Sequence, residues 1–334
     1  MRGGRLRRPD ATELEAAWRA VSDGLDVTPL LAADVPTPLG SVAGWLKLET
    51  FQPTGSFKVR GALAALRTLP PGRRAVSASA GNHALGMAWA ATRLGLPVTV
   101  ITARNASATK REDLAAFTRA PASPVTVVEH GLSYEEAEAF ARGIVATDPD
   151  ATYISAYSDH AVIAGAATIG KELESSSPPD EPVTVVVCLG GGGLASGVSL
   201  WGTARGHTRI VAAGAALSPA VSAAVDAGQR VEVGVGATLA DGLAGNLEAG
   251  CPTPGILGEA VAAGTAEITS VTEDELRVAM RWLYRAHGLV VEGAGAAAVA
   301  AVMAGRVRWT GRLVALVTGR NVTAETYAGV IDPR

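Results

Sequence analysis

The almost entirely apolar run Val183–Leu189 is followed directly by four glycines, Gly190–Gly193. A run of this kind is typical of a central strand in a parallel sheet, because both faces of such a strand are covered. The apolar strand, the glycine turn and the helix expected after it place the turn at the carboxyl end of the strand. Open α/β sheets bind their ligands at that end. The chain is therefore predicted to be an α/β protein built on parallel sheets.

Strand and helix patterns alternate along most of the chain, and turn residues at Pro70–Gly72 and Asp148–Asp150 mark two boundaries. The length of 334 residues, of which 48% are hydrophobic, exceeds what one compact core holds, so we expect two lobes with open parallel sheets. Four arginines lie within the first eight residues, and this segment contains no apolar core. The predicted segments are a disordered leader at 1–10, a large lobe made of 11–72 and 152–334, and a small lobe at 73–151.

Composition excludes several classes of function. The net charge of −3 and the pI near 6.0 leave no basic face for nucleic acid. The sequence contains no run of about twenty apolar residues, which is the length that a membrane helix needs. The two cysteines, Cys188 and Cys251, suit a reducing cytoplasm, and together with five scattered histidines they show no metal-ligand spacing. We expect a cytoplasmic protein that binds no nucleic acid, membrane or metal.

Lys58 stands in a turn rich in Gly, Ser and Thr, although only four of the 29 basic residues are lysines. Such a turn leaves N–H groups and hydroxyls free to point at a ligand, and a desolvated amine there can act as a nucleophile. An ordinary surface lysine before a helix starting near Val59 explains the same pattern. The residue alone does not decide between these interpretations.

The glycine turn is better suited to one phosphate than to a dinucleotide. Gly190, Gly192 and Ala195 fit the loose dinucleotide pattern, but the acidic residue expected about twenty positions later is replaced by Gly214–Ala216. A P-loop is excluded because no Gly-Lys-Ser/Thr follows. A single phosphate at a helix start, with a nucleophilic lysine elsewhere, indicates pyridoxal phosphate. A turn required only for close packing remains an alternative.

Several segments resemble, in the same order, those of the threonine dehydratase and serine racemase family. The similarity covers roughly residues 25 to 325 and implies a fold-type II pyridoxal-phosphate enzyme with a tryptophan synthase beta-like α/β fold. The segments are Lys47–Ala62, Ser79–Ala84, Ala161–Gly165, Gly190–Gly193, Leu239–Gly242 and Thr318–Asn321.

The resemblance also implies roles for individual residues toward the cofactor. Lys58 would form the Schiff base and later act as the base at the substrate Cα. The glycine turn would hold the phosphate, and Thr318 would meet the pyridine nitrogen, where a neutral hydroxyl favours early loss of a β-leaving group over transamination. The implied cofactor-binding residues are Lys58, Phe57, Asn82, Gly190, Gly191, Gly192, Gly193, Leu194 and Thr318.

A second group of residues is implied for the substrate, whose carboxylate would be received at the start of the helix after Ser79. Glu292 matches a family glutamate near the cofactor, but a carboxylate favoured by the helix dipole explains its position equally well. The implied substrate-binding residues are Ser79, Ala80, Gly81, Asn82, His83 and Glu292.

The resemblance implies an ammonia-lyase that converts L-threonine, L-serine or a related 3-hydroxy amino acid to a 2-oxo acid and ammonia. A serine racemase and a β-replacement enzyme of the cysteine-synthase kind are the alternatives. Racemases of the family have a serine where this chain has Ala80, which disfavours racemisation, and the carboxylate that helps bind a cation in many relatives is missing near Gly214. Leu85 and Arg320 also depart from the family pattern, so the pocket need not prefer threonine. A homodimer is expected.

Overall fold

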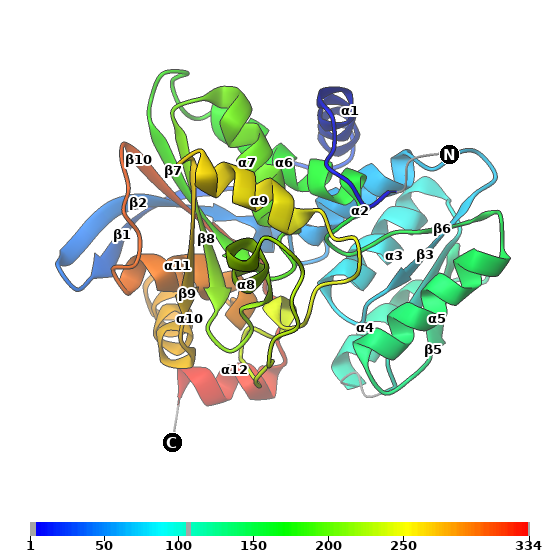
Figure 1. Cartoon of the computed structure of the whole chain (residues 1–334). Coiled ribbons are helices and arrows are strands. Elements are labelled where there is room, and N and C mark those ends of the chain that lie inside the picture. Colours follow the sequence, from blue (N-terminus) through cyan, green and yellow to red (C-terminus); the bar gives the residue numbers. More distant parts are fainter. Residues whose placement is uncertain (1–4, 105–107, 333–334) are drawn as a thin grey trace. The chain divides into compact units, whose positions relative to one another are not determined.

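The computed structural model describes residues 5–104 and 108–332, which form two compact units (Figure 1). One unit consists of Met1–Leu25 and Lys58–Gly165, and the other of Asp26–Phe57 and Ala166–Arg334. Each unit contains its own sheet of mainly parallel strands. The predicted α/β class with two sheet-containing lobes is therefore confirmed.

The first unit contains four parallel strands in the order β5-β4-β3-β6. Apolar residues of two helices, among them Leu63, Leu66 and Met87, pack in one core with strand residues such as Val100. The strands are β3 (Arg74–Ala78), β4 (Val98–Thr102), β5 (Val125–Glu129) and β6 (Ala151–Tyr153). The helices are α1 (Ala11–Ser22), α2 (Lys58–Arg67), α3 (Asn82–Leu94), α4 (Ala108–Thr118), α5 (Tyr134–Thr147) and the first part of α6 (His160–Glu174).

The second unit contains six strands in the order β1-β2-β10-β7-β8-β9, so that the orange β10 lies between the blue β2 and the green β7 (Figure 1). Strand β1 pairs antiparallel with β2, and the other neighbouring pairs are parallel. The strands are β1 (Leu30–Thr37), β2 (Gly40–Leu48), β7 (Val183–Leu189), β8 (Thr208–Ala215), β9 (Ala266–Val271) and β10 (Arg312–Val317). The helices are α7 (Gly193–Arg205), α8 (Ala220–Ala227), α9 (Thr253–Ala262), α10 (Glu273–His287), α11 (Gly293–Met303) and α12 (Ala324–Ile331), with 3-10 turns η1 (Glu49–Phe51) and η2 (Asp241–Leu243).

The units divide at different places from the predicted boundaries near 72 and 152. Helices α1 and α2, which we assigned to the large lobe, belong to the same unit as β3–β6. The reason is the close packing of α2 on α3, where a Cβ at Gly86 would lie 3.2 Å from backbone atoms of Lys58 and Val59. The Pro70–Gly72 turn is therefore a connection inside one unit.

The described part of the expected disordered leader has defined contacts. Arg5 forms an ion pair with the fully buried carboxylate of Asp159, and Leu6 forms a β-bridge with the same residue. Asp10 caps α1 through a capping box with Glu13. The prediction of disorder is therefore wrong for residues 5–10, and residues 1–4 lie outside the described part of the chain.

A buried ion pair fixes the end of β2. The Lys47 ammonium donates to the carboxylate of Glu172 at 2.6 Å and to the carbonyl of Thr28 at 2.6 Å. The side chains of the pair are only 2% and 3% exposed, so water cannot replace either partner. Removing one partner of a buried ion pair is strongly destabilising, because the remaining charge stays buried without compensation.

Lys47→Met should therefore lower the free energy of unfolding by about 3–5 kcal/mol, since it leaves the Glu172 carboxylate without its cation. The double variant Lys47→Met/Glu172→Gln should recover part of this loss, because it removes the uncompensated charge. Urea unfolding of the three proteins measures the difference. A single variant as stable as the parent protein would contradict the expected cost.

Candidate active site

Lys58 begins α2, one residue earlier than predicted, directly after the turn that contains Gly55. Its ammonium donates a hydrogen bond of 2.8 Å to the carbonyl of Ala156, and the residue is half-buried. The side chain is thus held at the start of a helix. This placement differs from that of an ordinary surface lysine and agrees with the nucleophile interpretation.

The predicted carboxylate-binding residues form the turn between β3 and α3. Gly81 is the N-cap of α3 and donates from its N–H to the hydroxyl of Ser79 at 3.2 Å, while Asn82 and His83 open the helix. Because its N-cap residue is a glycine, α3 has no capping side chain of its own at this position. Its first N–H groups can therefore serve an anion such as a substrate carboxylate. The structure brings Ser79, Ala80, Gly81, Asn82 and His83 together in one turn.

The His83 ring is buried, and neither of its nitrogens has a hydrogen-bond partner among the described residues. Burial lowers the pKa of His83 to about 3, and the nearby Lys58 ammonium adds to this effect. The Ile154 carbonyl opposes the shift weakly, but it is not in hydrogen-bond geometry with the ring and accepts from Ser77. His83 is therefore a neutral imidazole beside Lys58, and the group it can offer a carboxylate is its backbone N–H.

In the second unit, Gly190–Gly193 connect β7 with α7 as predicted. A Cβ at Gly190 would lie 2.9 Å from the Cα of Leu243, and one at Gly192 would lie 2.6 Å from the hydroxyl oxygen of Thr253. Gly192 also has a φ of +87°, which favours glycine. The N-cap residue of α7 is Gly192, which has no side chain to cap the helix, so the first N–H groups of α7 suit a phosphate. Leu194, in the first turn of α7, is buried.

The segments 54–57 and 318–321 are joined by several hydrogen bonds. Thr318 is 2% exposed, and its hydroxyl oxygen lies 3.5 Å from the sulfur of Cys188 on β7. Phe57 precedes Lys58 in the chain, so these bonds also fix the backbone that leads to the lysine. The bonds run from Phe57 N to Thr318 O at 3.0 Å, from Arg320 N to Gly55 O at 2.9 Å and from Asn321 Nδ2 to Thr54 O at 2.8 Å.

Glu292 is the N-cap residue of α11 and lies beside the 318–321 segment. Its N–H donates to the Gly319 carbonyl at 3.1 Å, and its side chain is buried although it does not cap the helix. Gly295 lies so close to this turn that a Cβ would be 2.4 Å from the Gly319 oxygen. Glu292 and Thr318 are therefore placed in one region of the second unit.

The sequence interpretation missed Thr253. Thr253 is the first residue of α9, and its hydroxyl donates to the carbonyl of Gly191 at 2.7 Å. No sequence pattern identifies this contact, because the partners are far apart in the chain. A threonine directly before Pro254 is the only local sign that a helix begins there.

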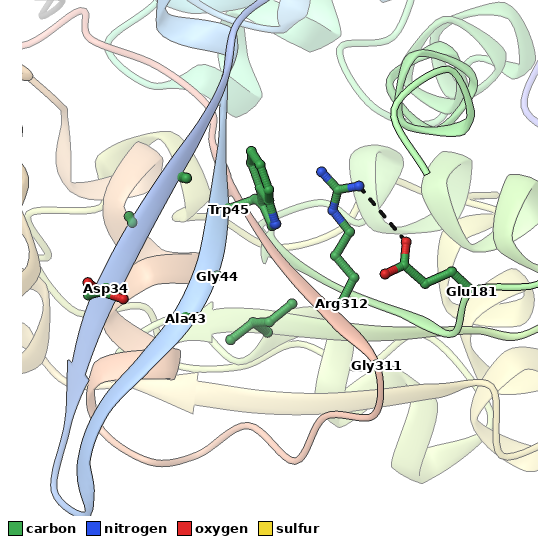
Figure 2. A pocket seen from close by; sticks show the side chains of 10 residues that line it. Asp34, Ala43, Gly44, Trp45, Glu181, Gly311 and Arg312 are labelled. Atoms are coloured by element: carbon green, nitrogen blue, oxygen red, sulfur yellow. Dashed lines mark ion pairs between the residues drawn. The ribbon is translucent and has the colours of Figure 1, made fainter. Parts of the chain in front are cut away.

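A separate pocket of about 480 Å³ lies on the strands β1, β2 and β10 (Figure 2). The guanidinium of Arg312 lines this pocket and stacks over the Trp45 ring, 4.3 Å from the ring centroid. It also lies 4.0 Å from a carboxylate oxygen of Glu181 and donates a hydrogen bond to the hydroxyl of Ser177. The guanidinium charge of Arg312 is thus already matched by protein groups. None of the predicted site residues lines the pocket.

Within residues 5–104 and 108–332, no three or more His, Cys, Asp or Glu side chains gather as metal ligands. In the same part of the chain, no helix combines the length and the apolar character needed to cross a membrane. Neither observation adds a residue to the candidate site.

A family profile described as pyridoxal-phosphate dependent enzyme matches residues 21–319. The L-threonine ammonia-lyase of Thermotoga maritima is 33% identical over 327 residues, covering 96% of this chain and 77% of that protein. The L-threo-3-hydroxyaspartate ammonia-lyase of a Pseudomonas species is 34% identical over 299 residues, covering 86% and 87%. A crystal structure of the T.th. threonine deaminase is similar with a TM-score of 0.80 at 29% identity, covering 94% and 99%. The profile match includes every predicted site residue.

His83 should make the protein lose stability in mild acid. Its pKa is about 3 in the folded state and about 6.5 in the unfolded chain, so below about pH 6.5 only the unfolded chain takes up this proton. The free energy of unfolding should fall between pH 7 and pH 5 by about 2 kcal/mol more in the parent protein than in His83→Gln. Urea unfolding at both pH values measures this. Equal losses in the two proteins would show that the buried ring does not resist protonation.

Proposed function

Since the chain belongs to the pyridoxal-phosphate dependent enzymes, we propose that it deaminates L-threonine, L-serine or a related 3-hydroxy amino acid to a 2-oxo acid. Pyridoxal phosphate is its cofactor, and the predicted fold-type II architecture is confirmed. The supporting observation is the set of hydrogen bonds between segments 54–57 and 318–321. These bonds hold the backbone before Lys58 against the turn that carries Thr318, and both residues match the family.

Bound pyridoxal phosphate supplies an aldehyde for the amine and a ring that accepts electrons from the substrate Cα. We assign the proton at Cα to Lys58, whose amine at the start of α2 would remove it. The N–H groups from Ser79 to His83 would orient the substrate carboxylate, and those of Gly190–Gly193 would bind the cofactor phosphate. Loss of the β-hydroxyl as water and hydrolytic release of ammonia then leave the 2-oxo acid.

The other cofactor contacts are proposals of the same kind. Phe57 and Asn82 would contact the pyridine ring, and the hydroxyl of Thr318 would meet its nitrogen. Because that hydroxyl is neutral, the ring would withdraw electrons less strongly than one paired with a carboxylate, which favours β-elimination. Glu292 is proposed to lie near the cofactor, because it is buried and bonded to Gly319, which directly follows Thr318 in the chain.

We propose the class of 3-hydroxy amino acids and do not specify which side chain the substrate carries. The names of two relatives specify threonine and 3-hydroxyaspartate, so the same family fold serves different side chains. Arg320 is exposed and Leu85 half-buried, and both depart from the family pattern. We also propose a cytoplasmic homodimer, based on the family resemblance and the cysteine content; sedimentation would test the dimer.

Lys58→Ala should abolish oxo-acid formation from L-threonine and L-serine, because no other amine is proposed to move the Cα proton. Lys171→Ala is the matched control, since Lys171 is exposed and pairs with Glu174 on the same helix. Borohydride reduction followed by peptide mass spectrometry should find the cofactor on Lys58 in the parent and control proteins. Turnover by Lys58→Ala without added amine would refute the assignment.

The parent protein should form oxo acid from L-serine without appreciable D-serine, because Ala80 has no group that can exchange a proton on the opposite face. Ala80→Ser supplies a hydroxyl at that position and should raise the yield of D-serine. Chiral chromatography measures both products. D-serine as the main product of the parent protein would favour the racemase alternative, and a need for added sulfide would favour β-replacement.

A further inference from the structure

The carbonyl of Gly191, in the middle of the glycine turn, is held by a side chain from another element. Thr253 is fully buried at the first position of α9, and its hydroxyl donates to this carbonyl at 2.7 Å. The approach is close, since a Cβ on the next residue, Gly192, would lie 2.6 Å from the same hydroxyl oxygen. The hydroxyl does not cap its own helix. Its role is therefore to bind the glycine turn.

This hydrogen bond sets the direction of the donors in the turn. In a trans peptide the C=O of one residue and the N–H of the next point in opposite directions. With the Gly191 carbonyl fixed on Thr253, the N–H of Gly192 points away from Thr253. The bond also turns a carbonyl oxygen, whose partial negative charge would repel a phosphate, away from the direction in which that N–H points.

We propose that Thr253 is a positioning residue for the phosphate of the cofactor, an inference that rests on the proposed function. It binds no part of the cofactor itself. It acts through the Gly191–Gly192 peptide, which it holds in the orientation that presents an N–H to the phosphate. Loss of the hydroxyl would leave the peptide free to rotate and its carbonyl without this partner.

Cys251 extends the same arrangement by one hydrogen bond. Its sulfur lies 3.1 Å from the Thr253 hydroxyl oxygen. A hydroxyl has one proton, and that of Thr253 is used on the Gly191 carbonyl, so the thiol of Cys251 must be the donor. Hydrogen bonds in such a chain polarise one another, so the thiol strengthens the bond to Gly191. Its contribution is smaller, because a thiol is a weak donor.

The test compares two ligands that differ only in the phosphate, pyridoxal phosphate and pyridoxal, on the full chain freed of cofactor. Thr253→Val removes the hydroxyl and keeps the shape, so its affinity for pyridoxal phosphate should fall about tenfold, with less than about a twofold change for pyridoxal. Thr253→Ser retains the hydroxyl and should recover most of the affinity. Absorbance titration measures both dissociation constants, and circular dichroism checks the fold.

A phosphate-selective loss in Thr253→Val with recovery in Thr253→Ser supports the inference. An unchanged affinity, or equal losses for the two ligands, overturns it and leaves Thr253 a packing residue. If Thr253→Val does not fold, Cys251→Ala decides in its place, with an expected phosphate-selective loss of about twofold. A parent protein that binds neither ligand instead contradicts the proposed function, so the two failures are distinguishable.

Discussion

The hydrogen bond from the N–H of Phe57 to the carbonyl of Thr318 has the largest structural consequence for the site. It closes a contact between segments that are more than 250 residues apart, and the bonds at Gly55 and Asn321 extend it in both directions. The Cβ of an alanine at Gly55 would come within 2.5 Å of the Asn321 side-chain oxygen, so the approach requires a glycine. The contact therefore holds the end of the 26–57 segment, which directly precedes Lys58 in the chain.

The sequence predicted the elements whose causes are local. The apolar run Val183–Leu189 predicts β7, and every residue of this strand is buried. Strand β1 has no comparable signal, because only its middle alternates between buried and exposed residues and Pro36 lies within it. The unit to which α2 belongs depends on its packing against Gly86 of α3. No pattern within α2 itself contains that information.

In the candidate site, too, the features with local causes were predictable from the sequence, and those that depend on distant residues were not. The turns that hold Ser79–His83 and Gly190–Gly193 each come from one short segment, and the family motifs identified them. The pKa of His83 depends on burial by distant residues and on Lys58, which no motif records. Thr253 escaped notice because its partner Gly191 lies 62 positions away. Arg5 falls in the predicted disordered leader because its partner, Asp159, lies 154 positions away.

The glycine turn after β7 is restricted by its protein neighbours. Leu243 restricts Gly190, Thr253 restricts Gly192, and the φ of +87° at Gly192 completes the constraint. A turn determined in this way loses little conformational entropy when an anion arrives, so the free energy of the phosphate contact is available for affinity. The apoenzyme would then present a preorganised phosphate cradle, and its reconstitution would be limited by encounter with the cofactor and not by ordering of this loop.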